Sequence, residues 1–259
     1  MEYQSITFTR YQEGYALLRL NRPDVFNAIN RELATEVQTV IETVRHAPEI
    51  RVLIITGSGK SFCAGGDLGW LMEAGDHLAK RDIVERAGRL IIELQEMSKP
   101  VIAAVNGVAA GAGTGVALAC DILIAADTAR FAPNFVNIGA VPDSGASWFL
   151  PRKVGYHRAA ELMLTGKLLS AEEALQLGIF QEVVPAGELE DKVFALAAGL
   201  ASGPQRAQTL IKRMLKMSAE NTLQAQLEME TSMQVAAWSD PDFQEGVTAF
   251  LERRKPDFS

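Results

Sequence analysis

The chain has 259 residues, of which 48% are hydrophobic and 22% charged, and its formal net charge is −7. This length can bury one large core, or one core with a smaller appendage. The acidic balance argues against nucleic acid and anionic membranes as partners, because both are bound through a positive field. Two cysteines, Cys63 and Cys120, are too few for a disulfide framework and match no metal motif. We therefore expect buried free thiols and no metal site.

No targeting or membrane segment is expected. Residues 1–14 contain acidic side chains and no apolar run, which is not typical of a presequence. The longest apolar stretch, residues 101–126, is interrupted by Asn106, Asp121 and several glycines, so it should not span a bilayer. A reducing, cytoplasmic location is the expectation that follows.

Strands and helices alternate in the first two thirds of the chain. Residues 15–20 predict a strand, apolar positions at helical spacing predict a helix from Asn30, and the continuously apolar residues 52–56 predict a strand buried on both faces. Further along we expect a helix within 76–97, a strand at 101–105, a small-residue helix through 119, and strands at 121–126 and 180–184. This alternation predicts an α/β layered architecture.

The last part of the chain changes character. Ser170 and Glu173 form a capping-box pattern, and Gly203-Pro204 separates two helical stretches. Asp240-Pro241 supplies an N-cap and a first-turn proline for a final helix that should end near Arg254. From residue 203 onward only helices are expected. We interpret them as an appendage that packs on the α/β core or on another subunit.

Two glycine-rich stretches invite nucleotide-binding interpretations that fail on their spacing. Residues 55–62 resemble a phosphate loop, but Ile54 stands where the motif needs its first glycine. Residues 111–115 follow a strand, but Val116 replaces the third glycine of a dinucleotide fingerprint. Such loops can instead offer free backbone N–H groups at a helix start to a developing oxyanion. They can also merely allow a helix to pack closely on a strand.

Several segments in order resemble the crotonase (enoyl-CoA hydratase/isomerase) family. The run KPVIAAVNGVAAGAGTGVALACDILIAADTARF, residues 99–131, is similar to the family's signature segment. Its other markers are matched by residues 21–23, 27–28, 62–68, 155–166, 171–183 and 250–258, so the resemblance covers nearly the whole chain.

This resemblance implies a fold, an assembly and a class of substrate. The fold would be a (ββα)n spiral core at residues 1–202, with a C-terminal helical trimerisation region at residues 203–259. The assembly would be a homotrimer or a hexamer made from two trimers. The substrate would be an acyl-CoA thioester, and no separate cofactor is expected because coenzyme A is part of the substrate.

The resemblance also assigns residues to the site. The backbone N–H groups of Gly66 and Ala112 would form the oxyanion hole for the thioester carbonyl, which gains negative charge when the neighbouring carbon loses a proton. The backbone near Ala64, Asp67 and Leu68 would lie at the coenzyme A adenine. Arg253 would approach the phosphates, although a solvated basic helix end is an equal alternative. Asp67 is also expected to hold its own loop.

The sequence departs from the family pattern where hydratases carry two glutamates. Gly115 and Phe135 occupy these positions, and neither can transfer a proton. Asp143 lies nearby in surroundings that resemble ring-1,2-epoxyphenylacetyl-CoA isomerases and Δ3,Δ2-enoyl-CoA isomerases, which use such an aspartate as acid and base. The same position is a nucleophile in 4-chlorobenzoyl-CoA dehalogenases, which carry Trp at the position of Phe135. An ordinary helix N-cap at Asp143 is the structural alternative.

We therefore predict an isomerase in which Asp143 moves a proton between two acyl carbons, shifting a double bond or opening a strained ring. Its pKa would be raised by burial and lowered by a helix N-terminus. Met72, Leu71, Phe135 and Trp148 are candidates for the acyl pocket, although each could simply belong to the core. A hydratase with other carboxylates, a dehalogenase-like hydrolase and a non-catalytic scaffold remain as alternatives. The three histidines are expected at the surface or in caps.

Overall fold

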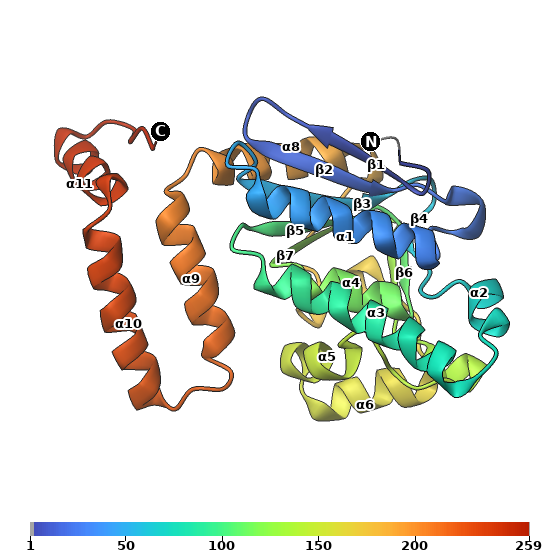
Figure 1. Cartoon of the computed structure of the whole chain (residues 1–259). Coiled ribbons are helices and arrows are strands. Elements are labelled where there is room, and N and C mark those ends of the chain that lie inside the picture. The colour runs from blue at the N-terminus through green and yellow to red at the C-terminus, as the bar shows by residue number, and fades with distance from the viewer. Residues whose placement is uncertain (1–2, 259) are drawn as a thin grey trace.

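The computed structural model describes residues 3–258. Met1 and Glu2 of the predicted core (1–202) and Ser259 of the predicted helical region (203–259) lie outside the described residues. Within residues 3–258, the strands form two sheets (Figure 1). The six-stranded sheet has the order β1-β2-β3-β5-β7-β10, in which only the β1–β2 pair is antiparallel. Its strands are β1 (Ile6–Arg10), β2 (Tyr15–Leu20), β3 (Val52–Gly57), β5 (Val101–Val105), β7 (Ile122–Ala126) and β10 (Glu182–Val184).

The second sheet is smaller and has the order β4-β6-β8-β9. Its strands are β4 (Ser61–Cys63), β6 (Val108–Ala110), β8 (Arg130–Ala132) and β9 (Leu169–Ser170). The first three are mutually parallel, and β9 runs antiparallel to β8. Because β4, β6 and β8 are parallel neighbours, the loops that leave their carboxyl ends lie at one edge of this sheet.

The chain repeats a strand–strand–helix unit three times. β3 and β4 are followed by α2 (Leu68–Glu73) and α3 (His77–Glu96), β5 and β6 by α4 (Ala112–Ala119), and β7 and β8 by a 3-10 turn and α5 (Ala146–Val154). Each unit places its first strand in the six-stranded sheet and its second strand in the four-stranded sheet, and one or two helices follow. This is the expected (ββα)n spiral.

The central strands β3 and β5 of the six-stranded sheet are buried on both faces, as their apolar sequences predict. On β3, Leu53 and Ile55 point into a core shared with α1 (Arg31–His46), whereas Val52 and Ile54 point toward α8 (Leu189–Ala201). The helix start predicted at Asn30 is confirmed, because its side chain accepts a hydrogen bond from the Leu33 N–H. Both cysteines are buried free thiols, also as predicted.

Residues 156–188, between α5 and α8, contain short elements, only some of which were expected from the sequence. This segment contains α6 (Tyr156–Thr165), β9 at the edge of the small sheet, and α7 (Ala171–Gln176). Ser170 and Glu173 form the predicted capping box at the start of α7. The strand expected over residues 180–184 is shorter and begins at Glu182.

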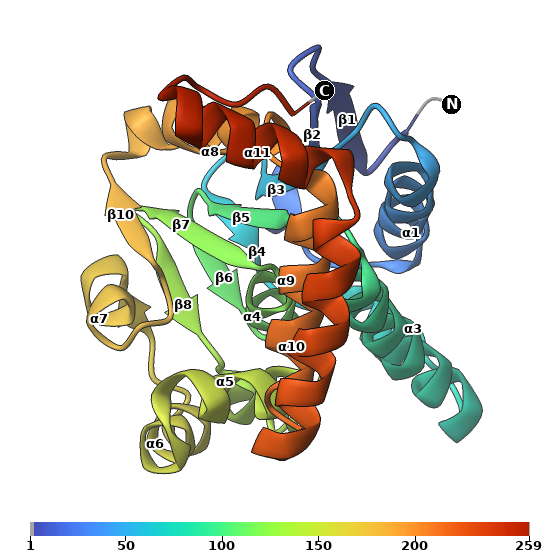
Figure 2. The same ribbon diagram turned by 90° about the vertical axis from the view of Figure 1, so that its left-hand side faces the viewer.

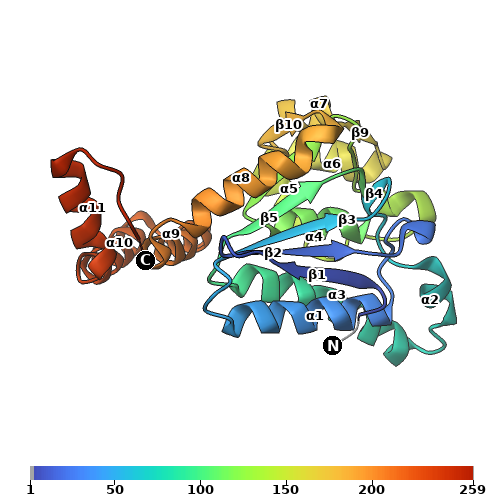
Figure 3. The same ribbon diagram turned by 90° about the horizontal axis from the view of Figure 1, so that it is seen from above.

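The C-terminal helices extend from one side of the core. α9 (Gln205–Met217) lies beside it, and α10 (Leu223–Trp238) and α11 (Pro241–Glu252) lie farther out (Figures 1, 2 and 3). Lys212 on α9 pairs with Asp121 at the start of β7, which ties α9 to the sheet. The final helix starts after Asp240 as predicted. Helix α8 ends at Ala201 and α9 begins at Gln205, on either side of residue 203; the role of residues 203–259 as a trimerisation region remains a prediction.

No helix between residues 3 and 258 combines the length and apolarity needed to cross a bilayer.

Candidate active site

The candidate site is built on the three loops that follow β4, β6 and β8. Gly66 follows β4, Ala112 follows β6, and Phe135 follows β8 on a short 3-10 turn. The first two loops touch each other, because a Cβ atom built on Gly65 would lie 3.2 Å from the backbone nitrogen of Ala112. Three loops that are distant in sequence thus meet at one edge of the small sheet.

Two backbone N–H groups in these loops have no protein partner. Among residues 3–258, neither the Gly66 N–H nor the Ala112 N–H donates a hydrogen bond. Ala112 is the first residue of α4, where N–H groups have no intrahelical acceptor and the helix dipole favours negative charge. Unpaired N–H groups are costly to bury, so this pair is suited to receive an external oxygen atom.

Gly66 and Ala112 line a pocket of about 250 Å³ that also contains the predicted carboxylate. The predicted residues Ala64, Gly66, Leu68, Ala112, Phe135 and Asp143 line it together. Leu71, a weighed acyl-pocket candidate, lines it as well. Two of the other lining residues, Arg86 and Asn134, are polar. The rest carry apolar side chains or none: Ile29, Ala34, Gly65, Trp70, Ile83, Val84, Ala87, Gly111, Ile138 and Ala140. Asp143 is the only carboxylate that lines the pocket.

Asp143 places a carboxylate oxygen in a buried position. Its Oδ1 atom is buried and has no hydrogen-bond partner in the described part of the chain. Burial raises the pKa of this carboxyl above its usual 3.8, and the adjacent Ser144 hydroxyl, which lowers it, does not offset this. The N-cap interpretation is wrong, because α5 is capped by Gly145 in a left-handed conformation and without any side-chain bond.

The backbone next to Asp143 fills the space where a hydratase-like glutamate would start. A Cβ atom built on Gly115 would lie 2.0 Å from the Ser144 carbonyl oxygen. Any side chain at residue 115 therefore requires the segment with Asp143 to move. Phe135, at the other glutamate position, is 7% exposed and forms an apolar wall of the pocket. No second carboxylate faces Asp143 in the pocket.

Comparison with known proteins identifies the family. The family model for enoyl-CoA hydratase/isomerase matches residues 10–259. The chain belongs to this family, the crotonase superfamily. A probable enoyl-CoA hydratase of Rhodobacter capsulatus is 40% identical over all of this chain and 99% of its own length. The 1,2-epoxyphenylacetyl-CoA isomerase of Escherichia coli is 41% identical over 96% of both chains.

The fold agrees with solved structures of the same family. A crystal structure of an enoyl-CoA hydratase from Bacillus anthracis has a TM-score of 0.95 and 33% sequence identity, and it covers 98% of this chain and 99% of its own. The crotonase fold is therefore established for the whole chain. The relatives include both hydratases and isomerases, so the exact reaction must be argued from the site.

Four of the predicted residues lie outside this pocket. Asp67 turns away from it, pairs with Arg22 and caps α2 through the Gly69 and Trp70 N–H groups. Met72 is 85% exposed on α2, and Leu71 takes its expected place, because one residue along a helix turns the side chain by about 100°. The expected contacts of the Asp67 backbone with the coenzyme A adenine and of Met72 with the acyl group stay predictions.

Trp148 and Arg253 are the other two predicted residues that lie outside the pocket. Trp148 stacks against Arg152 on α5, with the guanidinium carbon 3.9 Å from the ring centre, and lines a groove between α5 and α9. Arg253 is an exposed residue that ends α11 in a left-handed conformation. α11 and α2 lie at opposite ends of the molecule (Figures 1 and 3), so one chain does not bring Arg253 to the pocket.

The sequence missed several pocket residues. Ile83, Val84 and Arg86 from α3 and Ile138 and Ala140 from the loop before Asp143 share no motif, and only their packing brings them together. Hydrophobic spacing could have identified Ile83 as a buried residue of α3. It could not have shown that α3 lies opposite the loop with Ile138 and Ala140. Arg86 is the only cation at the pocket, and its Nε atom bonds Asp82 at 2.7 Å.

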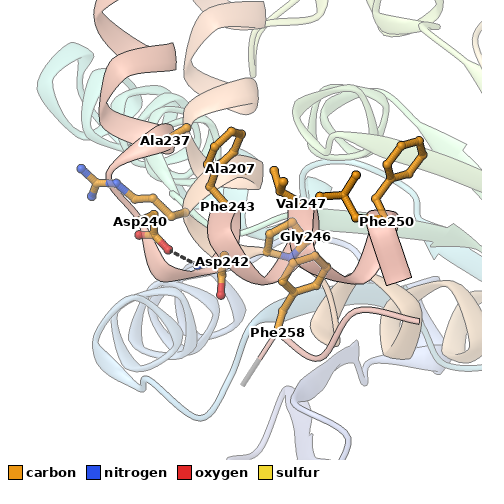
Figure 4. Close-up of a pocket in the computed structure, with 12 residues that line it drawn as sticks. Ala207, Ala237, Asp240, Asp242, Phe243, Gly246, Val247, Phe250 and Phe258 are labelled. Carbon is orange, nitrogen blue, oxygen red and sulfur yellow. Dashed lines mark hydrogen bonds between the residues drawn. The ribbon is translucent and has the colours of Figure 1, made fainter. Parts of the chain in front are cut away.

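Another hollow, of about 360 Å³, lies between α9 and α11 (Figure 4). Phe243, Val247 and Phe258 contribute to its apolar wall, and Asp240 in its rim bonds the Asp242 N–H. Its lining does not include a loop of the small sheet. All three histidines are exposed, as expected, and do not line the candidate site.

Proposed function

We propose that this chain is an acyl-CoA isomerase that uses one aspartate and an oxyanion hole. The thioester oxygen accepts hydrogen bonds from the Gly66 and Ala112 N–H groups. Asp143 takes a proton from one carbon of the acyl group, and the electrons move onto the thioester oxygen as an enolate. Asp143 then returns the proton to another carbon, which shifts a double bond or isomerises a strained ring. Water is not consumed.

The observation that carries this proposal is the buried, unpartnered Oδ1 of Asp143 in the same pocket as two free N–H groups. A raised pKa makes the carboxylate a stronger base once it is ionised, and it brings the value closer to neutral pH. One oxyanion-hole donor is typically worth about 3 kcal/mol of activation free energy. Two donors and one base are sufficient for a proton shift.

Hydration is the second candidate, and it is favoured by the relative named as a probable enoyl-CoA hydratase. Adding water to a double bond normally needs groups that both activate the water and protonate the carbon. Here Asp143 is the sole carboxylate of the pocket, and the backbone of Ser144 blocks a side chain at Gly115. These features support isomerisation over hydration.

An isotope experiment separates the two reactions. The purified protein is incubated in ¹⁸O-labelled water with 3-enoyl-, 2-enoyl- and aryl-epoxide-CoA esters, and the products are analysed by mass spectrometry. The proposal expects an isomer of unchanged mass and no ¹⁸O. Efficient incorporation of one ¹⁸O atom into 3-hydroxyacyl-CoA would assign the protein as a hydratase instead.

We also propose that the chain assembles as a trimer or as a hexamer of two trimers. Its accessible surface is 13567 Å², whereas a compact monomer of 28.1 kDa should expose about 11,000 Å². Large apolar side chains on the outer helices are exposed, including Leu223, Phe250 and Leu251. Arg253 needs a second chain to reach a pocket of this kind. Light scattering should give three or six chain masses, and a monomer would refute the proposal. A cytoplasmic location remains a prediction.

A further inference from the structure

The loop that carries Gly66 is held from behind by residues 26–29. The Ala64 N–H donates to the Phe26 carbonyl at 3.0 Å, the Ile29 N–H donates to the Gly65 carbonyl at 2.7 Å, and the Asp67 N–H donates to the Ile29 carbonyl at 2.9 Å. Backbone groups on both sides of the Gly66 N–H are thus bonded, while the Gly66 N–H itself is not.

The Gly65 carbonyl and the Gly66 N–H belong to one peptide plane and point in opposite directions. Whatever fixes the Gly65 oxygen therefore fixes the direction of the Gly66 N–H. The Ile29 N–H performs this role, and it belongs in turn to the peptide plane that contains the Ala28 carbonyl. The direction of the oxyanion donor thus depends on the orientation of the peptide between Ala28 and Ile29.

Arg22 controls that peptide and the next residue of the loop. Its Nη1 atom donates to the Ala28 carbonyl at 2.6 Å and to Oδ2 of Asp67 at 2.9 Å. The other carboxylate oxygen of Asp67 accepts hydrogen bonds from the first N–H groups of α2. The two side chains are 21% and 20% exposed, so solvent competes only partly for these bonds. Neither residue lines the pocket.

We infer that Arg22, acting with Asp67, is a positioning residue that sets the direction of the Gly66 N–H in the oxyanion hole. The inference rests on the proposed function of that hole. It differs from a general stabilising role, because loss of Arg22 should weaken polarisation of the bound thioester carbonyl more than it weakens binding of the ester.

The test compares Arg22→Met with Arg22→Lys and a matched control. Arg19→Met is the control, since it removes another Arg–carboxylate pair, with Glu190 at 2.8 Å, away from the loop. Arg19 is 24% exposed, close to the exposure of Arg22. Each variant is bound to butyryl-CoA labelled with ¹³C at the carbonyl, which has no double bond to shift. The carbonyl stretching frequency is then measured by difference infrared spectroscopy.

We expect Arg22→Met to lose at least half of the carbonyl downshift seen in the wild type, and Arg22→Lys to restore most of it. On a reactive ester, kcat should fall about 10- to 100-fold in Arg22→Met while KM changes less than about 3-fold, because a donor displaced by about 1 Å has this effect on rate. Arg19→Met should resemble the wild type in both assays.

A full downshift and a full kcat in Arg22→Met would overturn the inference while leaving the oxyanion hole intact. No downshift in the wild type would overturn the oxyanion hole itself, and the inference with it. If Arg22→Met does not fold by circular dichroism, Asp67→Asn replaces it as a variant of nearly equal shape, with the same expected loss of downshift. Asp143→Asn should keep the downshift, which separates these results from the role of the base.

Discussion

The contact between Gly115 and Ser144 makes a sharp prediction for Gly115→Ala. The added Cβ atom would lie 2.0 Å from the Ser144 carbonyl oxygen, 2.9 Å from its carbonyl carbon and 2.8 Å from its Cβ atom. Contacts shorter than 3.0 Å do not persist, so the backbone of Ser144 must retreat by about 1 Å. Asp143 is the preceding residue and must move with it.

Two consequences can be given magnitudes. Overpacking of this kind costs about 1–3 kcal/mol, and the better helix propensity of Ala returns up to about 1 kcal/mol, so we expect a net loss of about 1 kcal/mol in the free energy of unfolding. A misplacement of about 1 Å at a reacting group can lower the rate about 100-fold. Gly115→Ala should therefore lose activity far more than stability.

The assays are isomerase kinetics, acyl-CoA affinity and urea unfolding. Gly199→Ala on α8 is the matched control, because it places Ala in a helix where no atom lies within 4 Å of the new Cβ. The control should be as active as the wild type and equally or more stable. Wild-type kcat in Gly115→Ala would refute the reasoning that this contact fixes Asp143.

Three further predictions concern the N–H donors and titrating groups. Ala112→Pro removes one oxyanion donor at the first position of α4, where proline is tolerated. The kcat should fall about 100- to 1000-fold while the α-helical circular dichroism is retained. A wild-type kcat in this variant would exclude the Ala112 N–H as a donor. The acidic limb of kcat/KM against pH should lie above 3.8, because burial raises the pKa of Asp143 and only its ionised form is a base; an acidic limb at or below 3.8 would contradict this. Burial and the neighbouring Lys212 lower the pKa of Lys216 to about 8, so the folded state carries this charge at a cost below pH 8. Lys216→Met should then raise the free energy of unfolding at pH 7 by about 1 kcal/mol, after allowance for partial exposure. This gain in stability should shrink as the pH rises from 8 to 10.5. A gain that is constant with pH would contradict a lowered pKa of Lys216 as its cause.

The fold could be predicted because its signals are local or extend over long segments. The buried strand at residues 52–56, the capped helix after Asn30 and the proline start after Asp240 all appear where the sequence places them. The three-residue strands of the small sheet could not be found in this way, because they are too short to show a period. Their pairing partners lie far apart in the sequence, so no local signal marks them.

The site divides along similar lines. Gly66, Ala112 and Asp143 could be named from family resemblance, and the structure places them at one pocket. The direction of the pKa shift at Asp143 could not be predicted, because burial raises the pKa and a helix N-terminus would lower it. In the structure burial is the larger effect, and Gly145 rather than Asp143 caps the helix. Trp148 has the right type for an acyl pocket, but its ring stacks on Arg152 instead.

The most direct test of the central claim is isomerisation by Asp143→Asn, measured together with its affinity for the acyl-CoA ester. The variant keeps the shape of the side chain but cannot accept a proton. Our account predicts that kcat falls at least about 100-fold, as expected for loss of a general base, while the dissociation constant of the ester changes less than about 3-fold. Isomerisation at the wild-type rate would show that another group moves the proton, and would contradict the mechanism.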